Sequence, residues 1–329
     1  MDKKQLEAIQ KKYKDSIFRE AGEYDNSKLE SISTGSLALD LAIGLPLAHG
    51  IVEYAGQEGV GKTTLALEAV ANAQKKNFNI HWVDNEHSLN ERSFDGIDID
   101  KDKMQTMSPS NGEVACDYIE DVLRGFERNF IVIDSVATMQ SEKVMAESTS
   151  KDFMAMTARM MSQFLPKAVN LAARSNSVIL LINQLRDNPG YGAPEYTPGG
   201  RAVKYLTSER IFFKTTKAAR IQDSSGAFVG HEISATVAKN RFDSPYKTAT
   251  IPLFYKPGPH IDKQYEAANM ASDYGIVTGK AWLALNNDKG EEIGKWHGKS
   301  KFVNAMKEDA ALYNLIKNKI YETLQINNV

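Results

Sequence analysis

Residues 56–63 form the segment with the clearest chemical signature in the chain. They fit the phosphate-loop pattern Gly-x4-Gly-Lys-Thr, between an apolar run that predicts a strand and a helical pattern. The glycines let backbone amides curl around a triphosphate, and the start of the helix adds a partial positive charge. We expect Lys62 to reach the β and γ phosphates and the Thr63 hydroxyl to bind Mg²⁺. The predicted ATP-binding residues are Gly56, Gln57, Glu58, Gly59, Val60, Gly61, Lys62, Thr63 and Thr64.

Polar side chains stand at the ends of three other apolar runs. Asp134 ends one run, Glu86 follows the acidic end of a second, and Gln184 follows a third. Since the carboxyl ends of parallel strands meet at one edge of a sheet, we expect these side chains to face the phosphate site. There Asp134 would join the Mg²⁺ shell, Glu86 would orient a hydrolytic water, and Gln184 would bond the γ-phosphate without adding charge. Together these strand ends predict an ATPase.

The elements that must position these side chains are short strand-like runs that alternate with longer helical patterns. The strand-like runs are 51–55, 80–84, 130–135 and 178–183, and the helical patterns include 63–76 and 112–126. This alternation is typical of an α/β fold with a mostly parallel sheet covered by helices on both faces. Further strand-like runs at 210–214, 232–238 and 248–254 have little helix between them and predict a meander that extends the same sheet.

The two ends of the chain differ from this core. Residues 2–20 predict an amphipathic helix, whose apolar stripe is Leu6, Ile9, Tyr13 and Ile17. The stripe needs a partner, either the chain's own core or a neighbouring subunit, because residues 22–27 look like a tether. A composition break at 256–260 indicates a domain boundary. We therefore expect an N-terminal segment over 1–30, a core over 31–258 and a small C-terminal domain over 259–329.

Two long polar stretches, 140–152 and 185–200, follow predicted strands. The second is too long and too rich in Gly and Pro for a simple connection, so it is a functional loop or a disordered one. Loops of this kind beside an ATP site can bind a polymer such as nucleic acid through backbone amides, Arg and Lys. The chain has 40 Lys and Arg against 42 Asp and Glu, a net charge of −2, so any nucleic-acid site must be local.

The composition excludes several other classes of protein. With 42% hydrophobic and 25% charged residues among 329, the chain is typical of a globular protein with one large and one smaller domain. Its single cysteine, Cys116, excludes an internal disulfide and a multi-cysteine zinc site, and we expect a buried thiol in a helix. No apolar stretch has the length of a membrane helix and no signal core follows Met1, so we expect a cytoplasmic protein with no membrane partner.

Several short stretches, taken in order along the chain, resemble the bacterial RecA recombinase family. Besides the phosphate loop, they are Ser33–Asp40, Val83–His87, Val132–Val136, Ala158–Gln163, Ile182–Arg186, Gly199-Gly200 and Ala238–Arg241. The phosphate loop alone occurs in many ATPases, whereas this ordered set is specific to the family. The resemblance implies a RecA-like P-loop ATPase core, an N-terminal helix that docks on the adjacent protomer and a small α+β C-terminal domain.

The resemblance also implies an activity. Proteins of this family form an ATP-dependent helical filament of their own copies on single-stranded DNA, pair it with homologous double-stranded DNA and exchange strands in recombination and repair. The implied catalytic set includes Lys62, with Glu86 activating water and Gln184 sensing the γ-phosphate and relaying to the loop that begins after it. Lys239 and Arg241 match a pair that reaches across the subunit interface to the neighbour's ATP.

Two loops, at 141–154 and 185–199, are implied to contact DNA. The DNA-binding residues implied by the resemblance are Met154, Arg159, Ser162, Arg186, Tyr191, Gly199, Gly200 and Arg201.

The chain also departs from the family pattern. Ser93, with Phe94 beside it, stands where a Tyr that stacks on adenine is usual, Arg241 replaces a Lys, and Pro166 replaces an Arg in a helix. These departures fit a divergent or phage-encoded member, which would act in the host cytoplasm if a phage encodes it.

Two other functions stay open at this point. A ring-forming RecA-like helicase or motor would share the fold and the phosphate loop, although the family motifs favour the recombinase. An ATP-switched filament that binds single-stranded DNA without strand exchange would use the same residues. A joint-molecule assay on homologous and heterologous duplex DNA separates that filament from a recombinase.

Overall fold

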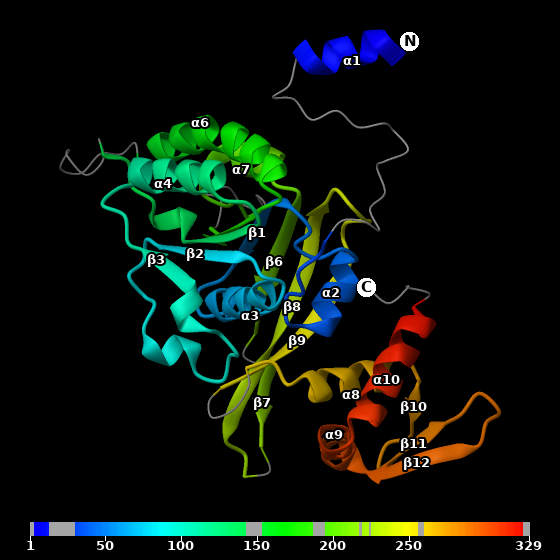
Figure 1. Ribbon diagram of the computed structural model, residues 1–329. Coiled ribbons are helices and arrows are strands. Elements are labelled where there is room, and N and C mark those ends of the chain that lie inside the picture. Colours follow the sequence, from blue (N-terminus) through cyan, green and yellow to red (C-terminus); the bar gives the residue numbers. More distant parts are fainter. Residues whose placement is uncertain are drawn as a thin grey trace.

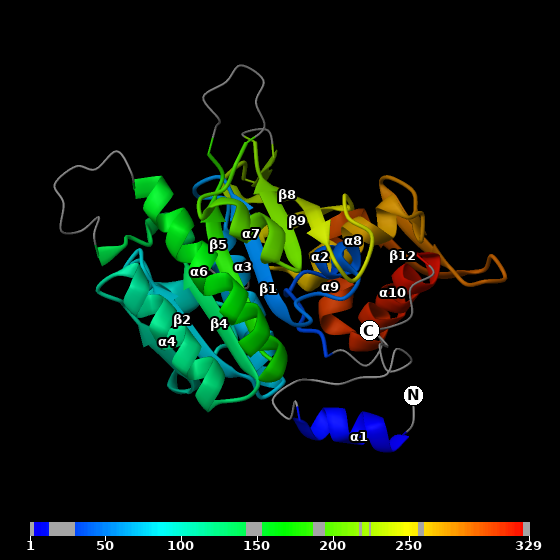
Figure 2. The ribbon, with the colours of Figure 1, turned by 90° about the horizontal axis from the view of Figure 1, so that it is seen from above.

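The computed structural model describes residues 3–12, 30–142, 153–186, 195–216, 219–223, 225–255 and 260–324. Most of these residues fold around one sheet of nine strands, in the order β3-β2-β4-β5-β1-β6-β8-β7, with β9 beside β8 (Figure 1). Helices lie on both faces of the sheet, and a smaller lobe that contains the C-terminal helices lies at its side (Figures 1 and 2). The predicted α/β fold with a mostly parallel sheet is confirmed.

The first six strands along the chain pair parallel with one another. The parallel strands are β1 (Gly50–Gly56), β2 (Asn79–Asp84), β3 (Met104–Met107), β4 (Asn129–Asp134), β5 (Val178–Gln184) and β6 (Glu209–Lys214). Continuous apolar runs such as 130–133 suit this position, since helices cover both faces of a parallel sheet. The four strands predicted before residue 200 are all present, whereas β3 was not predicted.

The helices that cover the sheet include both of the ranges predicted as helical, 63–76 and 112–126. They are α2 (Leu37–Ile43), α3 (Lys62–Lys75), α4 (Gly112–Gly125), α6 (Phe153–Arg174) and α7 (Gly200–Leu206). Helices α4 and α6 lie on one face and α3 on the other (Figure 1). Cys116 is buried in α4 as predicted, and burial raises the pKa of its thiol to about 12. Helix α6 continues through Pro166.

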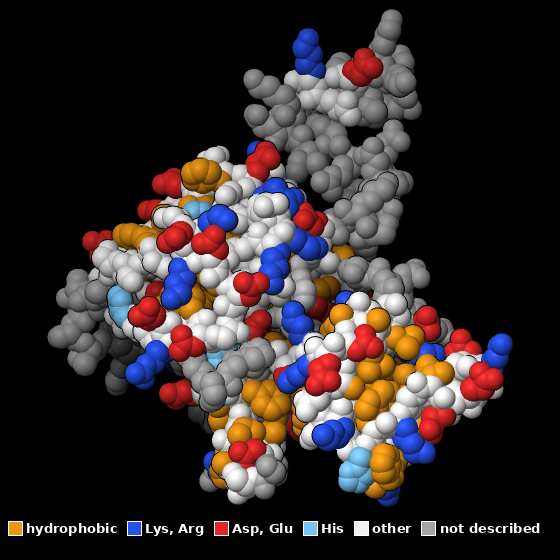
Figure 3. Space-filling view, turned by 60° about the horizontal axis from the view of Figure 1, so that its bottom comes forward, with side chains coloured by type: hydrophobic (Ala, Val, Ile, Leu, Met, Phe, Trp, Pro, Cys, Tyr) orange, Lys and Arg blue, Asp and Glu red, His pale blue; other side chains and the backbone are white. Residues whose placement is uncertain are grey.

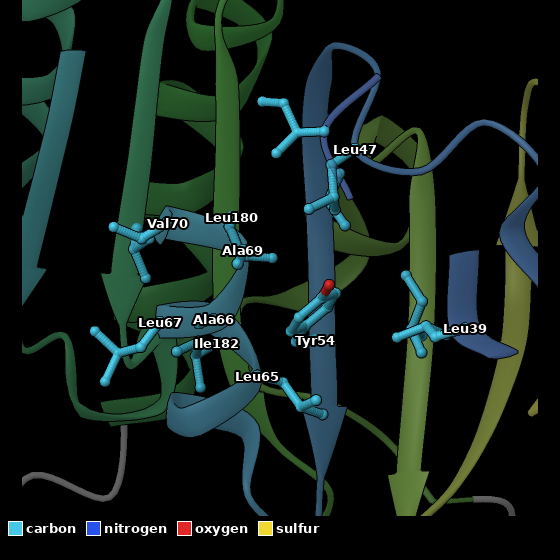
Figure 4. Close-up of a cluster of buried hydrophobic side chains, with 14 of the residues drawn as sticks. Leu39, Leu47, Tyr54, Leu65, Ala66, Leu67, Ala69, Val70, Leu180 and Ile182 are labelled. Carbon is cyan, nitrogen blue, oxygen red and sulfur yellow. The ribbon is translucent and has the colours of Figure 1, made fainter. Parts of the chain in front are cut away.

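The larger hydrophobic cluster lies between α3 and the sheet (Figure 4). It includes Tyr54 of β1, Leu180 and Ile182 of β5 and Leu65 of α3, all at most 1% exposed. Burial of one such side chain stabilises the fold by about 1.5–3 kcal/mol. Because this cluster joins β1 to α3, it holds the ends of the glycine-rich loop between them.

The strands beyond residue 200 extend the sheet at one edge. They are β6, β7 (Arg220–Gln222), β8 (Phe228–Asn240) and β9 (Thr248–Phe254). Strand β8 pairs antiparallel with β6, β7 and β9, as a meander requires. The predicted extension is confirmed, with one difference. Strand β6 also pairs parallel with β1, so the change of direction falls between β6 and β8.

The C-terminal lobe has a sheet and a core of its own. Its elements are α8 (Lys263–Asp273), β10 (Val277–Thr278), β11 (Trp282–Asn286), β12 (Glu292–His297), α9 (Gly298–Glu308) and α10 (Ala310–Thr323). Its hydrophobic cluster also includes Leu37 and Leu41 of α2. The carboxylate of Glu266 in α8 accepts hydrogen bonds from the Ser36 hydroxyl and from the Leu37 amide, the latter at 2.7 Å. The predicted boundary at 256–260 falls largely outside the described residues.

The N-terminal helix is separate from the rest of the described chain. Helix α1 (Lys3–Lys12) lies apart from the core, and Ile9 on it is 39% exposed (Figures 1 and 2). Tyr13 and Ile17 lie outside the described residues.

Acidic and basic side chains are interspersed over the face in Figure 3, so its described part has no continuous basic surface. Among the described helices, none has the length and apolar character needed to cross a membrane.

A buried carboxyl in β6 leads to a prediction about stability and pH. Glu209 is fully buried, and this burial raises its pKa from 4.5 to about 8. The folded chain therefore binds a proton that the unfolded chain releases between about pH 4.5 and pH 8, so stability falls as the pH rises through this range. Glu209→Gln, which imitates the protonated form, is expected to reduce the fall in the midpoint of thermal unfolding between about pH 6 and pH 9. The control is Glu127→Gln at an exposed position, and an unchanged slope in Glu209→Gln contradicts the prediction.

Candidate functional site

The glycine-rich loop connects the end of β1 to the start of α3. Gly61, the residue before α3, has a left-handed backbone with φ of 100°, and a Cβ there would lie 2.6 Å from Leu253. Only glycine avoids both the strain and the contact. Val60, fully buried, anchors the loop. The amides at the start of α3 therefore face the carboxyl edge of the sheet, where an anion is favoured.

Lys62 points back into this loop. Its Nζ donates hydrogen bonds to the carbonyl oxygens of Gly56, at 3.2 Å, and Gln57, at 2.8 Å. Burial lowers the pKa of Lys62, while the charges of Asp134 and Glu86 oppose this shift. The amino group thus lies within the loop that would enclose a phosphate chain, next to two carboxylates.

Thr63 and Asp134 form the predicted pair of metal ligands. The Thr63 hydroxyl donates a hydrogen bond of 2.9 Å to Oδ2 of Asp134, which is 1% exposed at the end of β4. Burial raises the pKa of Asp134 to about 7, and the charges of Glu86 and Asp84 act in the same direction. A hydroxyl and a carboxylate are oxygen ligands that suit Mg²⁺, which takes its remaining ligands from phosphate oxygens and water. These residues therefore fit a nucleotide-bound Mg²⁺.

Glu86 and Gln184 line the same hollow, of about 550 Å³, at the carboxyl edge of the sheet. Gln184 ends β5 directly opposite Gly56 in the strand pairing. Glu86 follows β2, and its Oε1 accepts a hydrogen bond of 2.5 Å from the Ser135 hydroxyl. The structure thus brings together strand ends that lie about a hundred residues apart, beside the glycine-rich loop.

Lys239 and Arg241 lie away from the glycine-rich loop of their own chain. Lys239 pairs with Arg210 at the start of β6, whereas Gly56 pairs with Phe213 near its end. The pair is therefore near the opposite edge of the sheet from the chain's own phosphate loop. Both side chains donate hydrogen bonds of 2.8 Å to the carbonyl oxygen of Tyr205, at the end of α7. Burial lowers the pKa of Lys239 to about 8, and the charge of Arg241 adds to this effect.

The predicted DNA-binding residues are partly described. Tyr191 and the side chain of Met154 lie outside the described residues, and Gly199 precedes α7 with a left-handed backbone. Exposed side chains of this set are Arg159, Ser162 and Arg201, and Arg186 is half-buried in a bridge with Tyr196. Gly200 packs against α6, because a Cβ there would lie 2.8 Å from that of Ala158. The end of the second polar stretch therefore lies against α6, the helix that follows the first polar stretch.

A buried polar network that the sequence analysis did not identify supports the second polar stretch. The Asn183 amide donates hydrogen bonds of 2.9 Å to Glu53 and to the Pro198 carbonyl oxygen. Arg210 donates to the other oxygen of Glu53, at 2.5 Å, and to the hydroxyl of Thr197. The sequence feature that could have pointed to this network is the position of Asn183, directly before Gln184. The network fixes the returning end of the stretch to β1, β5 and β6.

The described residues around Ser93 do not replace the aromatic side chain that is usual at this position. Phe94, the aromatic residue next to it, packs against the main hydrophobic cluster, and the amino group of Lys101 lies 5.3 Å from the centre of its ring. Ser93 accepts a hydrogen bond from the Asn90 amide. Phe94 therefore has contacts of its own, and the described residues assign no partner to an adenine ring.

The fold and this site define a P-loop ATPase of the RecA-like class, with a mixed sheet, a phosphate loop after β1 and a carboxylate at the end of β4. The chain matches the family model of the RecA N-terminal domain over residues 2–260. It belongs to the RecA family.

Known members of the family cover nearly the whole chain. The RecA protein of Mycoplasma mycoides subsp. mycoides is 34% identical over 313 residues, 93% of this chain and 88% of that protein. The RecA protein of Phytoplasma mali is 31% identical over 328 residues, 98% and 94% of the two chains. That of Chlorobaculum tepidum is 34% identical over 325 residues, 97% and 91%. Family membership makes the chain a RecA recombinase, a DNA-dependent ATPase of DNA recombination and repair.

Proposed function

We propose that this chain assembles as a helical filament on single-stranded DNA, uses ATP and Mg²⁺, pairs the strand with homologous double-stranded DNA and exchanges strands. One observation carries the proposal. Gln184 is paired with Gly56 of the phosphate loop and lines a hollow together with Glu86, and the polar stretch that starts at the next residue closes on itself through the bridge of Arg186 with Tyr196. A change in the bound nucleotide is therefore transmitted through Gln184 to a loop that is suited to binding DNA.

The phosphate loop binds the triphosphate. Lys62 exchanges its bonds to two backbone carbonyl oxygens for bonds to the β and γ phosphates, which fits its position inside the loop. Thr63 and Asp134 would hold Mg²⁺, whose chemistry there would be to neutralise charge on the phosphates. Glu86 accepts a proton from the attacking water, because it follows β2 at the same edge of the sheet and its charge acts on both Lys62 and Asp134.

DNA binds where α6 and α7 meet. Arg159, Ser162 and Arg201 are exposed there and can contact phosphates, and Arg186 contacts DNA from the stem of the second loop. We also assign DNA contacts to Met154 and Tyr191, and to the backbone of Gly199 and Gly200. Affinity is expected to fall with rising salt, since local phosphate contacts release counterions despite the net charge of −2.

Assembly uses the N-terminal segment and the pair at the end of β8. Residues 1–30 dock on an adjacent protomer, which fits the separation of α1 from the core. Residues 31–258 form the ATPase core and 259–329 the C-terminal domain. Lys239 and Arg241 complete a neighbour's ATP site. We place the protein in the cytoplasm, of the host if a phage encodes it.

A joint-molecule assay tests the proposal. The protein is incubated with ATP, Mg²⁺, a single strand and either homologous or heterologous duplex DNA. A recombinase forms joint molecules only with the homologous duplex. Binding of the single strand without joint molecules identifies an ATP-switched filament, and ATP-driven unwinding without pairing identifies a ring-forming motor. Either result overturns strand exchange.

The relay through Gln184 leads to a prediction about coupling. ATP is expected to raise the affinity for single-stranded DNA, and Gln184→Ala to erase most of this increase, of about 5- to 150-fold, while leaving nucleotide binding intact. The measurement is DNA affinity with and without a non-hydrolysable ATP analogue. The control is Gln222→Ala at an exposed position in β7. An undiminished effect of nucleotide in Gln184→Ala rules out the relay.

A further inference from the structure

We propose that Ser135 and Thr138 are positioning residues that hold Glu86 for water activation and connect it to α6, by a path separate from Gln184. The inference rests on the role of Glu86 in the proposed function. It starts from two hydroxyl groups in the segment that directly follows β4, which the ATP-binding and DNA-binding assignments do not use.

Ser135 fixes one oxygen of the Glu86 carboxylate. It is 1% exposed, and its hydroxyl donates the 2.5 Å hydrogen bond to Oε1 of Glu86. A serine hydroxyl has a single proton, so this bond uses its donor capacity. Glu86 is otherwise an exposed side chain on a connecting segment. The bond therefore restricts the orientation of the carboxylate and leaves its second oxygen to receive the proton of water.

Thr138 in turn holds Ser135. Its hydroxyl donates to the Ser135 carbonyl oxygen at 3.0 Å and lies 3.3 Å from the Ser135 hydroxyl oxygen. Asn85, next to Glu86, donates its backbone amide to the Asp134 carbonyl oxygen at 2.7 Å. The segments that carry the two partners, after β2 and after β4, are thus also tied to each other at the residues directly before Glu86 and Ser135. The arrangement leaves little freedom in the bond between Ser135 and Glu86.

The residues after Thr138 are bonded to two helices. The Met139 carbonyl oxygen accepts a hydrogen bond of 3.1 Å from the hydroxyl of Thr157, in α6, two residues before Arg159. The Gln140 carbonyl oxygen accepts one of 2.7 Å from the amide of Gly112, at the start of α4. A shift of α6 when DNA binds would therefore pass through Met139 to Thr138, Ser135 and Glu86.

The test compares kcat and KM for DNA-stimulated ATP hydrolysis in four variants of the full chain. We expect Ser135→Ala to lower kcat by about 10- to 100-fold and Thr138→Val to lower it several-fold, with KM for ATP and the affinity for a non-hydrolysable analogue unchanged, since orientation of Glu86 matters only in the transition state. Thr138→Ser, which keeps the hydroxyl, is expected to restore the rate. Ser175→Ala removes a buried hydroxyl bonded to Leu171 and is the control.

The result that overturns the proposal is wild-type kcat in both Ser135→Ala and Thr138→Val when their thermal unfolding matches the wild type. Equal loss in Thr138→Ser and Thr138→Val also overturns it, because the hydroxyl would then be irrelevant. Glu86→Gln, measured alongside, distinguishes failure of the catalytic role of Glu86 from failure of the positioning role of Ser135 and Thr138. If Glu86→Gln keeps the wild-type rate, the assignment of Glu86 itself fails. If only Glu86→Gln is slow, the positioning role alone fails.

Discussion

Replacement of Arg241 by alanine is expected to lower DNA-stimulated ATP hydrolysis by about 10³-fold or more while leaving ATP binding intact. The guanidinium lies near the opposite edge of the sheet from its own phosphate loop, bonded to the Tyr205 carbonyl oxygen at 2.8 Å. It can reach a triphosphate only in another copy of the chain, where it would act as an arginine finger, a contact worth about 10³–10⁵ in rate. Turnover per subunit should accordingly rise with protein concentration.

A mixing experiment tests this assignment. Arg241→Ala and Lys62→Ala are each expected to be inactive, the first without the cross-interface charge and the second without a working phosphate loop. In mixed filaments some interfaces pair an intact loop with an intact Arg241, so partial activity should return. Arg124→Ala, at an exposed position in α4, is the control. If both variants fold and co-assemble yet no activity returns, action across the interface is excluded.

Replacement of Glu86 by glutamine is expected to slow ATP hydrolysis by about 10²–10⁴-fold, the range for loss of a general base. Glutamine keeps the size of the side chain but accepts no proton, so ATP and single-stranded DNA should still bind and the filament should stay assembled. Lys62→Ala should instead weaken ATP binding and activity together, because Lys62 lies inside the loop that we propose binds the phosphates.

The measurements are steady-state hydrolysis, nucleotide affinity and DNA affinity for both variants. Glu91→Gln changes an exposed carboxylate a few residues further along the same connecting segment and serves as the matched control. Wild-type turnover in Glu86→Gln would remove Glu86 from the catalytic role. Loss of ATP binding in Glu86→Gln would show that the carboxylate supports the nucleotide site rather than the reaction.

The sequence alone was sufficient for the parts of the site that depend on local structure. The phosphate loop joins one strand to the next helix, so the spacing of its glycines, Lys62 and Thr63 already determines how these residues are placed between β1 and α3. The apolar runs before Asp134 and Gln184 determine buried strands, because such runs are stable only between two layers of helices. The family resemblance rests on the order of these same short segments.

Only the tertiary structure decided which distant residues meet. The order of strands in the sheet differs from their order in the chain, so β5 lies between β4 and β1 and brings Gln184 to the phosphate loop. The contact of Ser135 with Glu86 spans 49 residues, and that of Glu266 with Ser36 spans 230. No periodicity or motif encodes such pairs, because each depends on how several elements pack. The position of Arg241 was decided in the same way, since the pairing of β8 with β6 places it away from its own phosphate loop.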